Sequence, residues 1–152
     1  MIFKMFSMKK GITLAELLIS VAIAGILIGI SVAAFVNLSN TDQILGASQE
    51  ILSELRQARS QAVESLADSA YGVHFTSSSV TLFAGTTYQS GAAGNAVLPL
   101  PSNITISASP TDFVFSKISG TTTSGTIQAY ISSNSSYAKT ISVQSTGVAE
   151  LQ

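Results

Sequence analysis

The most extended feature of the hydrophobic pattern is an apolar run near the beginning of the chain. It follows Lys10 and continues to Val36, and the 20 positions 17–36 carry no charged residue. A run of about 20 uncharged residues is enough for a helix to cross a bilayer. The pattern therefore predicts a membrane-spanning helix. One carboxylate, Glu16, stands at its head, where an ionised group is unfavourable.

Beyond Val36 the pattern becomes amphipathic. Apolar residues recur at helical spacings, which is typical of one buried helix face. This face comprises Ile44, Leu45, Ile51, Leu52, Leu55, Ala58, Ala62, Val63 and Leu66. We predict one long helix from Ile12 to about Ser65 whose second half docks on a sheet, with a partner groove as the alternative. Asn40-Thr41-Asp42 offers a second helix start, with a bend near positions 37–42.

After Asp68, short alternating or β-branched runs replace the helical period. They predict strands at residues 71–75, 80–84, 104–107, 113–116, 126–131, 140–143 and 148–151. Turn-forming residues separate these runs, for example at positions 90–95 and 132–136. The sequence thus predicts an antiparallel β domain of six or seven strands packed on the helix, which is an α+β fold.

The charges around the apolar run give it an orientation. Lys4, Lys9 and Lys10 precede the run, whereas no acid precedes Glu16. Because lysines are retained on the cytoplasmic side, we expect a single-pass protein of the cytoplasmic membrane with its N-terminus in the cytoplasm. The C-terminal domain is then periplasmic or extracellular. A cleaved secretory signal is the alternative, but its apolar stretch is normally about 7 to 15 residues long.

The head of the run carries a family resemblance. The string Gly11-Ile12-Thr13-Leu14-Ala15-Glu16-Leu17-Leu18 resembles the leader signal of type IV prepilins and type II secretion pseudopilins. Ile12 stands where phenylalanine is commonest, and Ala15 where Ile or Val is usual. The resemblance implies cleavage after Gly11 by a prepilin peptidase/methyltransferase, N-methylation of Ile12, and a requirement for Glu16 during assembly.

The same resemblance implies a pilin-like fold and a division of the chain. The expected parts are a leader peptide at 1–11, a membrane-spanning or filament-core helix at 12–36, an amphipathic helix at 37–68 and an extracytoplasmic β domain at 69–152. The implied partners are the prepilin peptidase, other pilin or pseudopilin subunits, an inner-membrane assembly platform and the membrane itself.

Two features of the apolar helix have a physical interpretation of their own. Cleavage before Ile12 creates an ammonium four residues from Glu16, on the same side of a helix, so the two charges can pair within or between subunits. The alternative is that Glu16 only reaches the headgroup interface. Gly25 and Gly29 form a GxxxG spacing, which indicates either close helix packing or simple tolerance of glycine.

A second resemblance covers most of the chain. The helix at 52–62 reads Leu-Ser-Glu-Leu-Arg-Gln-Ala-Arg-Ser-Gln-Ala. With Tyr71-Gly72-Val73, Ile141-Ser142-Val143 and Gly147-Val148, it looks like minor pilins and pseudopilins of the GspH/FimT type. In that subgroup the final hairpin commonly carries Gly-Arg, whereas Val148 follows Gly147 here. The resemblance implies a minor subunit in or near the tip of a short filament.

Few residues offer catalytic or ligand chemistry. The chain has no cysteine and one histidine, His74, which strand alternation places on the face opposite Val73 and Phe75. No second imidazole or thiol accompanies it, and neither a G-x-S-x-G context nor a phosphate-binding fingerprint occurs. We therefore expect a structural histidine, no metal site, no cofactor and no enzymatic activity.

Nucleic-acid binding depends on basic residues that neutralise phosphates. Residues 69–152 contain only Lys117 and Lys139, and the whole chain has a net charge of −1. Arg56 and Arg59 lie in the helix among acidic residues, where surface pairing or subunit contacts are the expected roles. We therefore expect no direct DNA binding.

Two classes of function remain. The first is a minor pilin or pseudopilin, a non-enzymatic structural subunit processed after Gly11 and assembled through its N-terminal helix into a type II secretion pseudopilus or type IV pilus. The second is a singly anchored surface-binding module that does not polymerise. A plain anchor needs neither Gly11 nor Glu16, so the sequence favours the first class.

Overall fold

The structure of this protein is a computed structural model that describes residues 11–152, without the side chains of positions 32–34. Lys4, Lys9, Lys10 and the rest of the leader before Gly11 therefore lie outside the described residues. The chain divides into two compact units, of which the first ends at Leu38 and the second is Ser39–Gln152.

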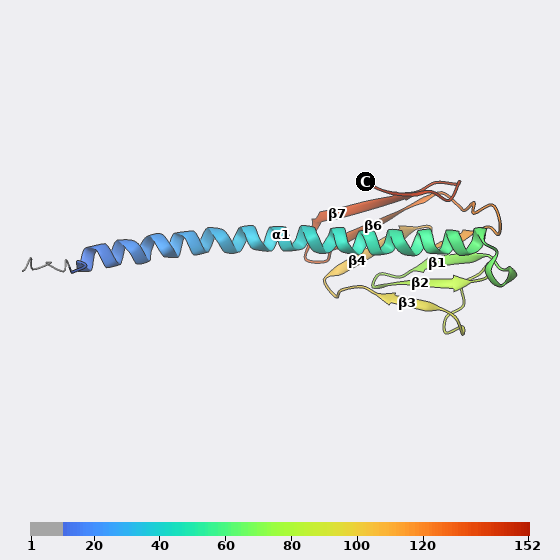
Figure 1. The fold of residues 1–152 in the computed structure, drawn as a ribbon, viewed down its shortest axis with the longest axis horizontal. Coiled ribbons are helices and arrows are strands. Elements are labelled where there is room, and N and C mark those ends of the chain that lie inside the picture. The colour runs from blue at the N-terminus through green and yellow to red at the C-terminus, as the bar shows by residue number, and fades with distance from the viewer. Residues whose placement is uncertain (1–10) are drawn as a thin grey trace, which may run out of the picture. The chain divides into compact units, whose positions relative to one another are not determined.

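One long helix precedes all the strands (Figure 1). This helix, α1, is Leu14–Val63 and includes positions 37–42, so no second helix start occurs there. A short 3₁₀ turn, η1 (Leu66–Asp68), follows it. Ser65 has a φ of 52°, in the left-handed region, which an α-helix of L-residues does not continue through. The helical segment therefore ends slightly before the predicted boundary.

The described residues contain eight strands in two antiparallel sheets. Their bounds are β1 (Tyr71–Phe75), β2 (Ser79–Ala84), β3 (Ala96–Pro99), β4 (Ile104–Ser109), β5 (Asp112–Phe115), β6 (Gly125–Ile131), β7 (Asn134–Val143) and β8 (Ala149–Leu151). One sheet has the order β3-β2-β1-β5 and the other β4-β6-β7-β8. Every neighbouring pair is antiparallel, and the fold class is α+β as predicted.

The second half of α1 and both sheets share one hydrophobic core. Strand alternation supplies it, as in β6, where Ile127, Ala129 and Ile131 are buried while Gln128 between them is exposed. The largest fully buried apolar side chains of this core are Ile51, Leu55, Val73, Val80, Phe113, Phe115, Ile127, Ile131 and Ile141. The predicted docking of the helix on a sheet is confirmed.

The buried face of α1 differs from the predicted one at its margins. Ser48 is fully buried, and its hydroxyl donates to the carbonyl oxygen of Ile44 at 2.7 Å, which satisfies the polar group inside the core. Leu45, Val63 and Leu66 are 37%, 43% and 49% exposed, so their prediction as core residues is wrong. Leu45 and Val63 lie about 100° from the centre of the buried face, and Leu66 lies beyond the helix.

All seven predicted strands are present, although several boundaries shift. The sequence misses β3, an edge strand of four residues that pairs only with β2 and ends at Pro99. It also starts β7 too late, because the Ser- and Asn-rich positions 134–136 resemble a turn. In the structure β7 begins at Asn134 and pairs with β6 across a register shift beside Ile131.

Candidate assembly site

A threonine caps the first turn of α1. Gly11, Ile12 and Thr13 precede the helix, and the backbone N–H of Glu16 donates to Thr13 Oγ1 at 3.2 Å. The N–H of Leu17 donates to the Thr13 carbonyl oxygen at 3.1 Å and begins the helical ladder. Thr13 and Glu16 therefore have the spacing of a capping box, in which a side chain satisfies an amide that the helix cannot.

This cap corrects the geometry predicted for Ile12. The sequence interpretation places Ile12 and Glu16 on one side of a helix, but α1 begins at Leu14 and Ile12 lies outside it. The Thr-x-x-Glu spacing at Thr13 is the signal that could have located the helix start. Glu16 falls in the first turn of α1, where the helix dipole favours a negative charge.

The first unit presents a large apolar surface. The side chains that are at least half exposed are Ile12, Leu14, Leu17, Leu18, Ile19, Val21, Ile23, Ile26, Leu27, Ile28, Ile30, Phe35, Val36 and Leu38. The hydroxyls of Ser20 and Ser31 donate to helix carbonyl oxygens four residues earlier, both at 2.7 Å, which suits an apolar environment. By length and composition, α1 is the helix of the described chain that could cross a membrane.

Gly25 and Gly29 lie within this apolar surface. A Cβ atom at either position would meet nothing within 4 Å, so no contact inside the described chain requires glycine there. Close packing against another helix and simple tolerance of glycine therefore both stay open as predictions.

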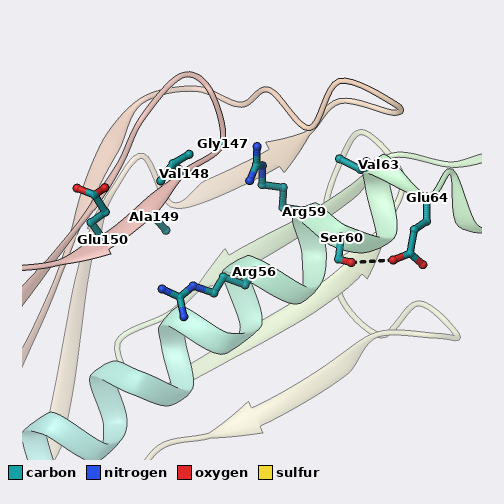
Figure 2. A pocket seen from close by; sticks show the side chains of 9 residues that line it. All are labelled: Arg56, Arg59, Ser60, Val63, Glu64, Gly147, Val148, Ala149 and Glu150. Carbon is teal, nitrogen blue, oxygen red and sulfur yellow. Dashed lines mark hydrogen bonds between the residues drawn. The ribbon is translucent and has the colours of Figure 1, made fainter.

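A groove lies at the other end of α1, between the helix and the last hairpin (Figure 2). Its volume is about 480 Å³, and it is lined by Arg56, Arg59, Ser60, Val63, Glu64, Gly147, Val148, Ala149 and Glu150. Gly147 has a φ of 81°, and a Cβ there would lie 1.9 Å from the Gly120 carbonyl oxygen and 2.9 Å from Arg59 Nε. Glycine at 147 is therefore what lets Arg59 lie against the hairpin.

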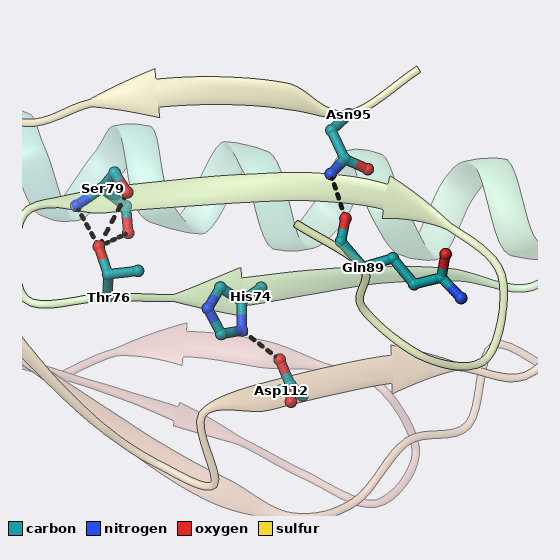
Figure 3. A network of polar contacts seen from close by, with 6 residues as sticks. All are labelled: His74, Thr76, Ser79, Gln89, Asn95 and Asp112. Atoms are coloured by element: carbon teal, nitrogen blue, oxygen red, sulfur yellow. Dashed lines mark hydrogen bonds and ion pairs between the residues drawn. The ribbon is translucent and has the colours of Figure 1, made fainter. Parts of the chain in front are cut away.

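His74 of β1 forms a structural contact on the outer face of the β3-β2-β1-β5 sheet (Figure 3). Its Nδ1 donates to Asp112 Oδ1 at 2.5 Å, and its ring stacks on Tyr88 with a centroid distance of 3.8 Å. The expected structural role of His74 and its predicted strand face are confirmed. The sequence could not show Asp112 as partner, because β5 lies far from β1 along the chain. Among the residues that the structure describes, no three His, Asp or Glu side chains gather as metal ligands.

Comparison with known proteins identifies the family. The family model for the type II transport protein GspH matches residues 47–147 of the 152. This chain belongs to the GspH family. A second model, the prokaryotic N-terminal methylation motif, matches residues 6–32 and includes the capped turn with Glu16. A search of curated proteins finds no match to this GspH-family chain.

Solved structures share the fold of this GspH-family protein. The type IV minor pilin FimU of Pseudomonas aeruginosa gives a TM-score of 0.58 at 16% identity, over 73% of this chain and 89% of its own. The minor pseudopilin EpsH from the type 2 secretion system of Vibrio cholerae gives 0.54 at 14% identity, over 72% and 96%. The fold is thus pilin-like, and the protein is a structural subunit of the minor pilin and pseudopilin family.

The last hairpin of this GspH-family protein has a cationic neighbour that the sequence does not reveal. Val148 follows Gly147, so the hairpin has no arginine of its own. Instead Arg59 of α1 lies against Gly147. No local pattern signals this contact, because it depends on the close approach of two segments that are distant along the chain.

Proposed function

We propose that this protein is cleaved after Gly11, N-methylated at Ile12 and inserted through α1 into the core of a type II secretion pseudopilus or type IV pilus. The observation that carries the proposal is the methylation-motif match at 6–32 on a helix whose apolar side chains are exposed. Such a surface needs lipid or other helices around it. The expected partners are the prepilin peptidase/methyltransferase, other pilin subunits and the assembly platform.

The proposed parts of the chain follow from this function. Residues 1–11 are the leader, 12–36 move from the membrane into the filament core, and 37–68 connect them to the β domain at 69–152. The N-terminus faces the cytoplasm and the β domain lies outside it. Gly25 and Gly29 allow close helix packing in the filament, and no catalytic role is assigned to any residue.

Glu16 is the proposed assembly residue. The ion pairs of the described residues join other side chains, and no hydrogen bond there engages the Glu16 carboxylate, which remains available for another group. Cleavage after Gly11 supplies that group, because the new ammonium of Ile12 lies near the head of the same helix or of a neighbouring one. An unpaired charge in the membrane core is unfavourable by about 2.5 to 3.5 kcal/mol on insertion scales, so pairing favours entry into the filament.

Exchange of the carboxylate for an amide tests this role. The Glu16→Gln variant keeps the capping-box side chain type but loses the charge, so we expect normal insertion and cleavage and a loss of about tenfold or more in filament incorporation. Immunoblots of the membrane fraction measure insertion and cleavage, and immunoblots of the sheared-filament fraction measure incorporation. Thr13→Ala is the matched control, because it removes the cap hydroxyl and keeps the acid. Normal incorporation of Glu16→Gln would contradict the proposal.

A further inference from the structure

Two segments at the C-terminal end of α1 have unusual backbone conformations. In residues 11–152, the non-glycine residues with a positive φ all lie in these two segments. Ser65, Ala67 and Asp68 have φ values of 52°, 49° and 56° just after the helix, and Ile118 has a φ of 68° in the loop between β5 and β6. A β-branched residue is rare in this left-handed region, because its side chain crowds the backbone. Strain of this kind persists only where the surrounding structure holds it, and it often marks a functional position.

Hydrogen bonds fix the loop of Ile118 against the end of α1. The Ile118 N–H donates to the Ala62 carbonyl oxygen at 3.0 Å, and Lys117 Nζ pairs with Asp68 Oδ1. The Ser119 N–H donates to the Lys117 carbonyl oxygen at 2.8 Å. Ile118 is therefore the central residue of a γ-turn of the rare form with positive φ. The loop holds this side chain in one place.

The strained isoleucine does not contribute to the core. Ile118 is 70% exposed, and Val63 and Leu66 on the adjoining segment are 43% and 49% exposed. The loop packs beside Val63, because a Cβ at Gly120 would lie 2.7 Å from Val63 Cγ2. Glycine or asparagine would adopt the backbone of Ile118 with less strain and without exposing apolar surface. We call Val63, Leu66 and Ile118 the distal patch.

The charged groups beside the distal patch are balanced in sign. Lys117 and Asp68 pair with each other, and Glu64 and Arg59 lie in the last turns of α1. Neither Arg59 nor Arg56 takes part in an ion pair of the described residues, so the surface pairing expected for them from the sequence is wrong. Two cations and two acids attract neither an acidic nor a basic partner. The complementary surface is therefore uncharged and apolar.

We propose that the distal patch docks on an apolar surface of a different pilin-family subunit in the same filament. This chain belongs to a family of minor subunits, so its neighbour is another chain and the contact is made once, without repeating from copy to copy. On the proposed function α1 begins in the membrane, so its C-terminal end faces a subunit that was assembled earlier. The inference rests on the proposed assembly function and assigns it a recognition surface outside the membrane segment.

A substitution that relieves the strain separates docking from folding. Ile118→Asn in the full chain should unfold at a denaturant concentration no lower than the wild type, because asparagine tolerates a left-handed backbone. Its amount in sheared filaments should fall by about tenfold, because the apolar contact is lost. Ile118→Leu keeps an apolar side chain and should retain the wild-type amount. Val97→Asn is the control, since Val97 is 61% exposed on β3, outside the patch.

The outcomes of this comparison are distinct. Normal incorporation of Ile118→Asn would overturn the inference alone. A loss of stability that accounts for its loss from filaments would also overturn it, because Ile118 would then serve the fold. Absence of the wild-type chain from filaments would overturn the assembly function as well.

Photo-crosslinking identifies the occupant of the patch. Benzoylphenylalanine incorporated in place of Ile118 should give, in isolated filaments, one adduct with a different protein whose mature N-terminus is methylated. The same residue in place of Val97 should not give this adduct. An adduct with a second copy of this chain, an adduct with lipid, or no adduct at all would overturn the inference.

Discussion

Gly147 is the residue on which the groove between α1 and the last hairpin most depends. Its backbone has a φ of 81°, and the space where a Cβ would lie is occupied by the Gly120 carbonyl oxygen and Arg59. A side chain at this position meets both backbone strain and a steric clash. The identity of this residue therefore decides whether the hairpin can approach Arg59 of α1.

We expect replacement of Gly147 to destabilise the fold. Gly147→Ala should lower the free energy of unfolding by about 2 to 4 kcal/mol, because the left-handed backbone and the overlap both contribute. Gly91→Ala is the matched control, since Gly91 has a φ of 74° but open space around it, and should lower it by about 1 to 2 kcal/mol. Denaturant titrations of the full chain in detergent, followed by tyrosine fluorescence, measure both. Equal losses would contradict the packing described for Gly147.

Single residues differ in how far the sequence reveals them. Gly11, Ile12 and Glu16 are recognisable because their chemistry lies in one short string, and Thr13 is readable from its spacing to Glu16. Asp112 and Arg59 are not, because their partners His74 and Gly147 are brought to them only by the folded chain.

At the scale of elements, α1 combines two different surfaces in one helix. Its first half exposes apolar side chains, and its second half buries one face against two sheets. Hydrophobic periodicity predicts both halves and most strands, because burial determines residue type directly. It misassigns the margins of the buried face and misses β3, because this exposed edge strand has only four residues, lacks polar–apolar alternation and ends at Pro99.

Two leucines of α1 test the corrected face. Leu55 is 1% exposed and Leu45 is 37% exposed. We expect Leu55→Ala to lower the free energy of unfolding by about 2 to 5 kcal/mol, because it leaves a cavity in the core. Leu45→Ala should lower it by less than about 1 kcal/mol, because solvent already reaches this side chain. Denaturant titrations of the full chain in detergent measure both free energies of unfolding. Similar losses at both positions would contradict the assignment of Leu55 to the core and of Leu45 to the margin of the buried face.

Glu54 of α1 gives the fold a pH dependence. Burial raises the pKa of Glu54 above 4.5, so between the unfolded and folded pKa values the folded chain holds more protons than the unfolded one. Stability therefore falls as pH rises through that window. Glu54→Gln should remove this slope and stabilise the unassembled chain at neutral pH by at most about 0.5 kcal/mol, since solvent screens the group.

Urea titrations between pH 4 and 7 measure the slope for Glu54→Gln. Glu50→Gln makes the same charge change at an exposed position and serves as the control. A Glu54→Gln variant whose stability depends on pH as strongly as that of the wild type would contradict the assigned burial.

At the scale of the whole molecule, the two units serve the proposed function by different means. The first unit has exposed apolar side chains and the methylation motif, and the second has its own core and a GspH-family match. The composition of each segment predicts this division, because an uncharged helix and a Ser/Thr-rich β domain suit different surroundings.

The most direct measurement is the mass of the N-terminal peptide from protein isolated in sheared filaments. Peptidase cleavage before assembly predicts a peptide that begins at Ile12 and carries one additional methyl group. Filament-borne protein that still begins at Met1 would contradict the account, because the ammonium proposed to pair with Glu16 would then not exist.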